Sequence, residues 1–292
     1  MRATYRQCIL ALFILLSTVQ CQTLKNFFVS DTDKVTTSPV GPVVAFVEMD
    51  DTSKSDGWVR LIVKTNSVYS DAQQARAAGI GEGYVTADQI LYSWVNTLAG
   101  YCADQTPYCV RLDYYLLQTN HWLDFMVKTN KKSSYWRHVD LIRIQINGMF
   151  DGFNAIYPGR LKLSDFHLMN LSGDLEDLEQ ALGGPGGEGL LETRARKHML
   201  GTGSCSALIK WVPGDLMTSH ITWNSYQSLV RVMKHYVLNF KDGEELMKGR
   251  TQVFSSYPGY ITSGDDYSLI GSGLATMETT IGNSNSSLWE VR

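Results

Sequence analysis

The chain has 292 residues, of which 44% are hydrophobic and 11% aromatic, and its formal net charge is −3. This length suits one large domain or two small ones, and the apolar share is high enough for a substantial core. Because neither sign of charge dominates, the composition excludes the basic footprint of a nucleic-acid-binding protein and a polybasic membrane patch. We therefore expect a globular protein with no nucleic-acid partner.

The first residues indicate export. Arg2 and Arg6 precede an apolar run at 9–19, which is followed by Gln-Cys-Gln. The run is shorter than the roughly 20 apolar residues that span a bilayer, and it has the flanks of a secretory signal. We predict a signal peptide at 1–21, and the alternative is an uncleaved signal anchor. No later stretch reaches membrane length, so we expect no transmembrane segment in the mature form and a location in the lysosome or outside the cell.

Two sequence triplets have the form of N-glycosylation sites. They are Asn170-Leu-Ser and Asn285-Ser-Ser. Such triplets also occur by chance, but export makes a surface glycan on Asn170 and on Asn285 an expectation.

Three cysteines remain after removal of the signal peptide. Cys102 and Cys109 bracket a short loop suited to a local disulfide in an oxidising compartment. Cys205 is then the odd thiol of an exported protein, which is typical of a reactive or intermolecular cysteine. A buried, inert cysteine is the alternative, and the spacing alone does not decide between them.

The first half of the chain begins with strands and continues with helices. Alternating or continuous apolar residues predict strands over 43–48 and 58–64. Helical composition, apolar spacing and terminal signals predict helices over 71–79, 86–100, 114–130 and 136–157. The apolar stripes of these helices are explained by core packing.

The composition changes after Asn170. An acidic stretch is followed by a Gly/Pro cluster at 183–189 and by Gly-Thr-Gly-Ser at 201–204. This density of glycine favours an exposed segment, where self-cleavage or proteases can act. We predict a flexible processing segment over 173–204, and an ordinary linker between two domains is the alternative.

Regular structure is expected to resume at Cys205. The pattern predicts a strand over 205–212, a turn, a returning strand over 220–226 and then a helix over 227–240. One or two strands are expected between 269 and 280, with a polar turn over 281–287.

Several families of catalytic site have no sequence support. The chain lacks a Gly-x-Ser-x-Gly elbow with a later Asp and His, and it lacks His-Glu-x-x-His, paired Cys-x-x-Cys and a Gly-rich phosphate loop followed by Lys. We therefore predict neither a metal nor a cofactor.

Cys205 suits an N-terminal nucleophile because it opens a strand directly after a glycine-rich tetrapeptide. Cleavage of the Ser204–Cys205 bond produces a thiol and a free α-amine on one residue. An α-amine has a reference pKa of about 7.7–8.0, against about 10.4 for lysine, so it can act as a general base closer to neutrality. The thiol can cut the precursor bond itself through an N-to-S acyl shift, which the flexible glycines assist. A buried strand cysteine would look similar in the sequence.

Four blocks of the sequence, at 203–210, 220–226, 256–266 and 278–285, carry a family resemblance. They closely resemble the corresponding blocks of the phospholipase B-like family, which includes the lamina-ancestor proteins. The resemblance implies an α+β fold, the four-layer αββα fold of N-terminal-nucleophile hydrolases, incomplete at the C-terminus because members of the family are longer. It also implies cleavage before the cysteine into two chains that stay together, residues 22–172 forming the first and 205–292 the start of the second.

The resemblance places the nucleophile on Cys205. Its pocket is expected to be lined by His220, Thr222, Trp223, Asn224 and Asp266. Chemistry suggests that Asn224 or Asn283 donates to an oxyanion, that His220 holds the α-amine or leaving group, and that Asp266 orients a donor. For His220 a plain strand histidine is the alternative, and for Asn283 a turn residue.

The family implies hydrolysis of fatty-acyl ester bonds in phospholipids, as part of lipid catabolism. An N-terminal nucleophile would serve equally well as an amidase on N-acyl lipids or peptides. A non-catalytic, secreted lipid-binding glycoprotein is the third alternative. The expected partners are thus a lipid or acyl-amide substrate and the protein's own cleaved N-terminal chain.

Overall fold

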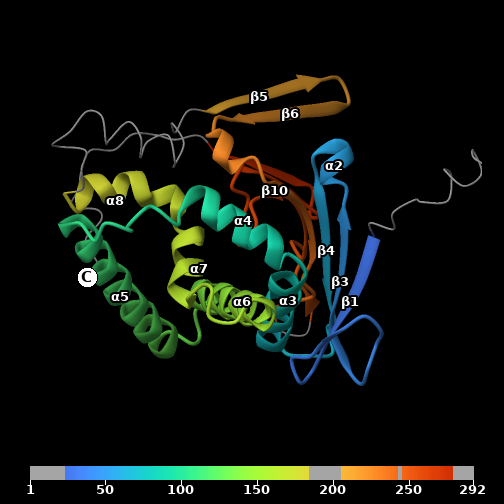
Figure 1. Cartoon of the computed structure of the whole chain (residues 1–292). Helices are drawn as coiled ribbons and strands as arrows, with labels where there is room; N and C mark the ends of the chain where they lie inside the picture. Colours follow the sequence, from blue (N-terminus) through green and yellow to red (C-terminus); the bar gives the residue numbers. More distant parts are fainter. Residues whose placement is uncertain (1–23, 184–204, 243–244, 279–292) are drawn as a thin grey trace, which may run out of the picture.

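The computed structural model describes residues 24–183, 205–242 and 245–278 of the chain (Figure 1). The predicted signal peptide, Ser204, Asn283 and Asn285 lie outside these ranges. The first strands and a short helix are β1 (Leu24–Ser30), β2 (Val35–Thr36), β3 (Val43–Asp51), α2 (Ser53–Asp56) and β4 (Val59–Thr65). Helices follow: α3 (Asp71–Val85), α4 (Ala87–Thr97), α5 (Pro107–Thr129), α6 (Ser134–Ile156), α7 (Leu163–Asn170), the 3-10 turn η1 (Ser172–Asp174) and α8 (Leu175–Ala181).

The part after residue 204 is mainly β-structure. It contains β5 (Cys205–Val212), β6 (Asp215–Thr222), the 3-10 turn η3 (Tyr226–Ser228), β7 (Val232–Val237), β8 (Lys241–Asp242), β9 (Glu245–Leu246), β10 (Thr251–Ser256), β11 (Tyr267–Ile270) and β12 (Leu274–Met277). The fold is α+β, as predicted.

One mixed sheet of eight strands unites the two parts of the chain, in the order β12-β11-β10-β7-β4-β3-β1-β2. Its neighbours are antiparallel except for β4 and β7, which pair in parallel from Val59 opposite Val232 to Lys64 opposite Val237. A parallel pair needs a long crossover connection. Here the crossover contains all the helices from α3 to α8, so residues far apart in the sequence become neighbours at the centre of the sheet.

Side chains alternate between the two faces of the sheet. In β7, Val232, Lys234 and Tyr236 are buried, while Met233 and His235 are only half-buried. The buried face lies under α3, and Figure 1 shows the helices gathered on this side. Residues that pair directly across strands share a face, so the other face carries Met233 and its β10 partner Ser255.

The predicted helix over 227–240 is wrong, because this segment forms η3 and then β7. The spacing of its apolar residues fits either a helix or a strand. The segment forms a strand because β4 and β10 pair with β7 through backbone hydrogen bonds on both sides. Likewise, the returning strand of the hairpin is β6, which begins and ends earlier than the predicted 220–226.

Helix α3 does not stop at Gly79 but continues to Val85. Its glycines make a close approach to α6 possible. A Cβ atom at Gly79 would lie 2.0 Å from the carbonyl oxygen of Gln145, and one at Gly83 would lie 2.0 Å from that of Met149. Gly79, which was expected to end the helix, is therefore part of the surface of α3 that packs against α6.

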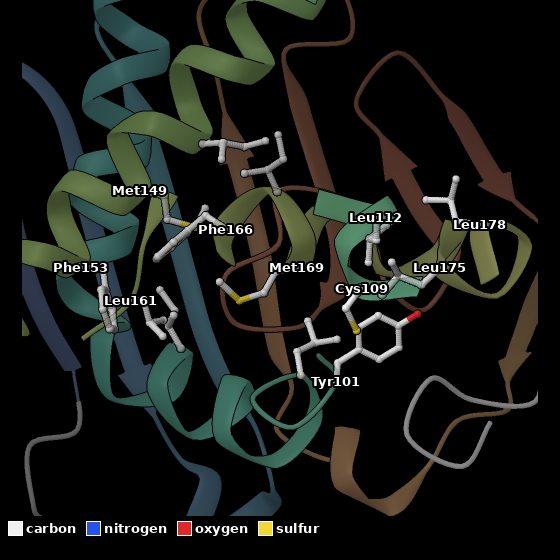
Figure 2. Close-up of a cluster of buried hydrophobic side chains, with 14 of the residues drawn as sticks. Tyr101, Cys109, Leu112, Met149, Phe153, Leu161, Phe166, Met169, Leu175 and Leu178 are labelled. Carbon is white, nitrogen blue, oxygen red and sulfur yellow. The ribbon is translucent and has the colours of Figure 1, made fainter. Parts of the chain in front are cut away.

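The main core lies among the helices, and Figure 2 shows its buried side chains. Phe166 of α7 packs against Phe153 of α6 with 5.6 Å between ring centroids. The predicted disulfide between Cys102 and Cys109 is confirmed, and it fastens the α4–α5 connection beside this core.

Helix α8 contributes to the same core. Leu175 and Leu178 are 0% and 1% exposed, and Glu179 accepts a 2.7 Å hydrogen bond from the buried hydroxyl of Tyr101. The beginning of the segment predicted to be flexible, 173–204, is therefore a packed helix. The remainder, from 184 to 204, lies outside the described residues.

Asn170, a predicted glycan site, forms polar contacts at the end of α7. Its Nδ2 donates to the carbonyl oxygens of Phe166 and Gly259, both at 2.9 Å, and its Oδ1 accepts from the backbone N–H of Ile261 at 2.9 Å. A glycan would be attached to this nitrogen. Glycosylation of Asn170 stays a prediction, and it would require at least one of these donor contacts to break.

Candidate active site

Strands β5 and β6 form a hairpin separate from the large sheet, and Figure 1 shows it at one end of the molecule. Cys205 is opposite Thr222, and the turn uses Gly214 at a φ of 81°, a left-handed conformation that glycine adopts without strain. Much of the hairpin's apolar surface is exposed: Leu208, Ile209, Trp211, Leu216, Met217 and Ile221. Cys205 is half-buried, and it is the free cysteine of the described residues.

One edge of the hairpin is fixed to the large sheet and its loops through β6. The Thr218 hydroxyl lies 2.9 Å from the hydroxyl of Tyr267 in β11, and Thr222 Oγ1 donates to the carbonyl oxygen of Asp265 at 2.6 Å. Thr218 and Thr222 are four residues apart on a strand, so their side chains share a face. That face of β6 therefore lies toward the large sheet.

A pocket of about 450 Å³ lies where the hairpin meets the large sheet. It is lined by Thr218, Ser219, His220, Thr222, Arg231, Ser255, Asp265 and Tyr267. Because Ser255 faces away from α3, the pocket is on the face of the sheet opposite the helices. Polar side chains dominate its walls, and the charged Arg231 and Asp265 are among them.

His220 is held by two hydrogen bonds. Its Nε2 lies 2.7 Å from the carbonyl oxygen of Glu278, and a carbonyl can only accept, so Nε2 donates. Its Nδ1 lies 3.1 Å from Thr222 Oγ1. Because both ring nitrogens have partners, this arrangement suits a fixed donor and not a base that removes the Cys205 proton.

A second polar network joins the two loops beside the pocket. Arg231 Nε lies 3.2 Å from Asp265 Oδ2, and its guanidinium lies 4.3 Å from the centroid of the Tyr257 ring. The Tyr257 hydroxyl donates to Asp265 Oδ1 at 3.0 Å and accepts from Asn224 Nδ2 at 2.6 Å. The network thus connects a pocket wall with the residue expected to stabilise an oxyanion.

Asp266 has a strained backbone and a perturbed carboxyl group. Its φ is 57°, in the left-handed region that is uncommon for residues other than glycine. Burial raises the pKa of Asp266 to about 6; the negative charge of Glu278 adds to this effect, His220 opposes it and Asp265 adds to it. A carboxyl group with this pKa can exchange a proton in mildly acidic solution.

The predicted site residues are brought together only in part. His220 and Thr222 line the pocket, and the hairpin register puts Cys205 beside Thr222. Asn224 belongs to the hydrogen-bond network next to the pocket wall, and Asp266 interacts electrostatically with His220 and Asp265 of the wall. Trp223 is 60% exposed and does not line the pocket. Asn283 lies outside the described residues.

Sequence reasoning missed Arg231, Asp265 and Tyr257. Arg231 lies in the segment 227–240, for which the sequence predicts a helix without a functional role. Tyr257 and Asp265 both belong to the block 256–266, which resembles the family, so that block contained the signal. What the sequence did not reveal was that these three side chains meet.

Two further findings concern metal ligands and membrane-spanning helices. Among residues 24–183, 205–242 and 245–278, no group of three or more His, Cys, Asp or Glu side chains is placed to hold a metal ion. Within the same ranges, no helix has both the length and the apolar character needed to cross a membrane.

Comparison with known proteins identifies the family. The family model described as phospholipase B matches residues 45–292. The chain is 41% identical over 261 residues to the Mus musculus protein named "Putative phospholipase B-like 2", covering 85% of this chain and 42% of that protein. The Homo sapiens protein of the same name is also 41% identical, with 85% and 43% covered. "Phospholipase B-like protein B" of Dictyostelium discoideum is 33% identical over 243 residues, with 80% and 42% covered. The chain spans about two fifths of the length of these relatives, and it belongs to the phospholipase B family.

Proposed function

We propose that this chain carries the nucleophile of an acyl hydrolase, with Cys205 as an N-terminal nucleophile released by cleavage of the Ser204–Cys205 bond. The observation that carries the proposal is the position of a free cysteine as the first residue of β5, opposite Thr222, which lines the polar pocket. Membership of the phospholipase B family supports a hydrolase.

The reaction follows from the groups on Cys205. After cleavage the α-amine takes the thiol proton, and the sulfur attacks the acyl carbonyl carbon. A C–S bond forms, the carbonyl electron pair moves to the oxygen, and the tetrahedral intermediate then collapses with loss of the alcohol or amine, which takes the proton. Water attacks the resulting thioester in the same way, releasing the fatty acid and regenerating the thiol.

The surroundings of the pocket offer hydrogen-bond donors to this reaction. Asn224 Nδ2 has one N–H group left for the oxyanion, and His220 is held close to Thr222 with its Nε2 donating to the carbonyl oxygen of Glu278. Asp266, with its pKa near 6, is a further group able to orient or transfer a proton. Trp223 is next to these residues in sequence, and its exposed ring is available to an acyl chain.

The proposed fold is the four-layer αββα arrangement of N-terminal-nucleophile hydrolases. It is supported by two of these layers, the helices and the eight-stranded sheet, and by a hairpin that meets the sheet on the side opposite the helices. The half-buried residues on that face, among them Ile62, Met233 and Val253, suit contact with a second sheet.

The proposed substrate is a fatty-acyl ester of a phospholipid, in keeping with the names of the relatives. An amide of an N-acyl lipid or peptide is the second candidate, because attack by an N-terminal thiol serves either bond. The proposed location is the secretory pathway, in the lysosome or outside the cell. The non-catalytic alternative, a secreted lipid-binding glycoprotein, remains an outcome of the test.

The test is to express the full chain in a secretory host, hold the product at about pH 5 and sequence the N-termini. We expect a new chain beginning at Cys205 in the wild type, and only uncut protein from Cys205→Ala. Fluorogenic fatty-acyl esters and amides are then compared as substrates of the processed protein. Ragged cuts that appear equally in both proteins would contradict self-processing, and lipid binding without hydrolysis would favour the glycoprotein.

A further inference from the structure

The hydroxyl of Tyr257 fixes the orientation of the Asn224 side chain. A phenol has one proton, and that of Tyr257 is donated to Asp265 Oδ1 at 3.0 Å. The phenol oxygen can therefore only accept from Asn224, which presents its Nδ2 at 2.6 Å. The other end of the amide agrees with this assignment, because Asn224 Oδ1 accepts from the backbone N–H of Ser225 at 2.7 Å.

Tyr257 is itself held firmly from several directions. Its side chain is buried, and the Arg231 guanidinium, paired with Asp265, covers its ring. Its carbonyl oxygen accepts from Lys234 Nζ at 3.3 Å. Gly264 closes another side, because a Cβ atom there would lie 2.0 Å from the ring. Because the Tyr257 ring cannot move in this site, the Asn224 amide must take the orientation that the phenol hydroxyl allows.

The position of Asn224 relative to the nucleophile follows from the hairpin register. Cys205 is opposite Thr222, the last residue of β6, and Asn224 comes two residues later. The Asn224 amide is therefore at the same end of the hairpin as the Cys205 thiol. Only one of its two Nδ2 hydrogens is used by Tyr257, and the second has no hydrogen-bond partner in the described part of the chain.

We propose that Tyr257 is a positioning residue, which aims the second N–H of Asn224 at the acyl oxygen of a substrate under attack by Cys205. This inference rests on the proposed function and adds to it a residue that the sequence did not indicate. Negative charge develops on the acyl oxygen as the C–S bond forms, and a donor already fixed in place stabilises that charge without reorganising. Tyr257 forms no bond to the substrate.

The phenol must stay protonated to do this. Burial raises the pKa of Tyr257, and the negative charge of Asp265 raises it further. The proton donated to Asp265 is therefore retained at acidic and neutral pH. Loss of that proton is not expected to limit activity anywhere in the physiological range.

The experiment compares Tyr257→Phe with the wild type in the processed protein, using a 4-nitrophenyl fatty-acyl ester. Removal of one oxyanion donor typically lowers kcat by 10²–10³-fold, which we expect for Asn224→Ala. Tyr257→Phe leaves the Asn224 amide in place but removes the hydrogen bond that orients it. We therefore expect a loss of about tenfold or more in kcat, with KM within about twofold of the wild-type value. The double variant should be no slower than Asn224→Ala alone, because Tyr257 acts only through Asn224.

Tyr260→Phe is the matched control. Tyr260 is three residues further along the same loop, and its hydroxyl contacts Ser172 at 2.8 Å and not Asn224. Tyr260→Phe also removes one hydroxyl from this loop, but not one that contacts Asn224. We therefore expect its kcat to stay near the wild-type value. A fall in kcat equal to that of Tyr257→Phe would mean that any disturbance of the loop suffices, and it would overturn the positioning role.

The remaining outcomes are also decisive. An unchanged kcat in Tyr257→Phe, or losses that multiply independently with Asn224→Ala, overturns the inference while leaving the proposed function intact. A wild type that neither self-cleaves nor hydrolyses overturns the proposed function and the inference together. Should Tyr257→Phe fail to fold, Asp265→Ala tests the same point: it removes the acceptor of the phenol proton, so the phenol no longer has to accept from Asn224 Nδ2, and an unchanged kcat contradicts the positioning role.

Discussion

Replacement of Lys234 by methionine should remove a large part of the stability of the fold. Lys234 is 0% exposed and Glu82 is 1% exposed, and their charged groups lie 2.6 Å apart between β7 and α3. Lys234 Nζ also donates to the carbonyl oxygens of Tyr257 and Tyr260, and the Tyr236 hydroxyl donates to Glu82. All the polar groups of this cluster depend on one another.

The magnitude follows from what the substitution leaves behind. Removing one partner of a buried ion pair typically costs about 3–5 kcal/mol, because the remaining charge is buried without compensation. The two carbonyl oxygens lose their donor as well, so we expect Lys234→Met to fall in the upper part of this range, at about 4–5 kcal/mol. Native domains are stable by roughly 5–15 kcal/mol, so the variant should be marginal.

The double variant Glu82→Gln/Lys234→Met tests the reasoning. It removes both charges, and the glutamine oxygen can still accept from Tyr236. We expect it to recover at least about 2 kcal/mol relative to the sum of the two single variants, since the unpaired charge is gone. The assay is urea unfolding followed by tryptophan fluorescence. A cost below about 1 kcal/mol for Lys234→Met, or simple additivity of the pair, would refute the buried-charge argument.

Three further expectations concern separate parts of the fold. Because the folded-state pKa of Asp266, about 6, exceeds its ordinary value of 3.8, the folded state binds more protons between these values. Stability should therefore fall as pH rises from 4 to 6, and urea unfolding across this range should show a shallower fall in Asp266→Asn. Gly83→Ala should lower Tm by several degrees despite the better helix propensity of alanine, because its Cβ meets Met149 of α6; Gly100→Ala, where nothing lies within 4 Å, is the control, and an equal Tm in both would contradict the packing argument. Cys102→Ser should cost about 2–3 kcal/mol in urea unfolding under oxidising conditions, and an equal loss under reducing conditions would show that the cross-link is not the cause.

Local patterns in the sequence were sufficient for several parts of this structure. The strands at 43–48 and 58–64 alternate or run apolar in the way a half-buried sheet requires, and the short spacing of Cys102 and Cys109 indicated their disulfide. The strand that begins at Cys205 was predicted with its correct bounds. Each of these features depends on residues close together in the chain.

The missed features depend on distant partners. Residues 227–240 were predicted as a helix because their apolar spacing fits one, but β4, about 170 residues earlier, pairs with them as a strand. Glycine is common just after a helix end, so Gly79 was expected to stop the helix. In the structure it is an interior residue of α3 that packs against α6. Arg231 and Asp265 belong to different loops, so no local sequence pattern indicates that they form an ion pair.

The parallel pairing of β4 and β7 also bears on what cleavage before Cys205 would do. These strands belong to opposite sides of the proposed cut, and they are adjacent at the centre of the eight-stranded sheet. The buried pair of Glu82 and Lys234 crosses the same boundary, because α3 precedes the cut and β7 follows it. Separation of the two chains would expose the central strand edges and leave two buried charges without partners, both of which are costly. Cleavage before Cys205, as proposed, would therefore create a new N-terminus without releasing either chain, and both chains would continue to support the sheet beside the pocket.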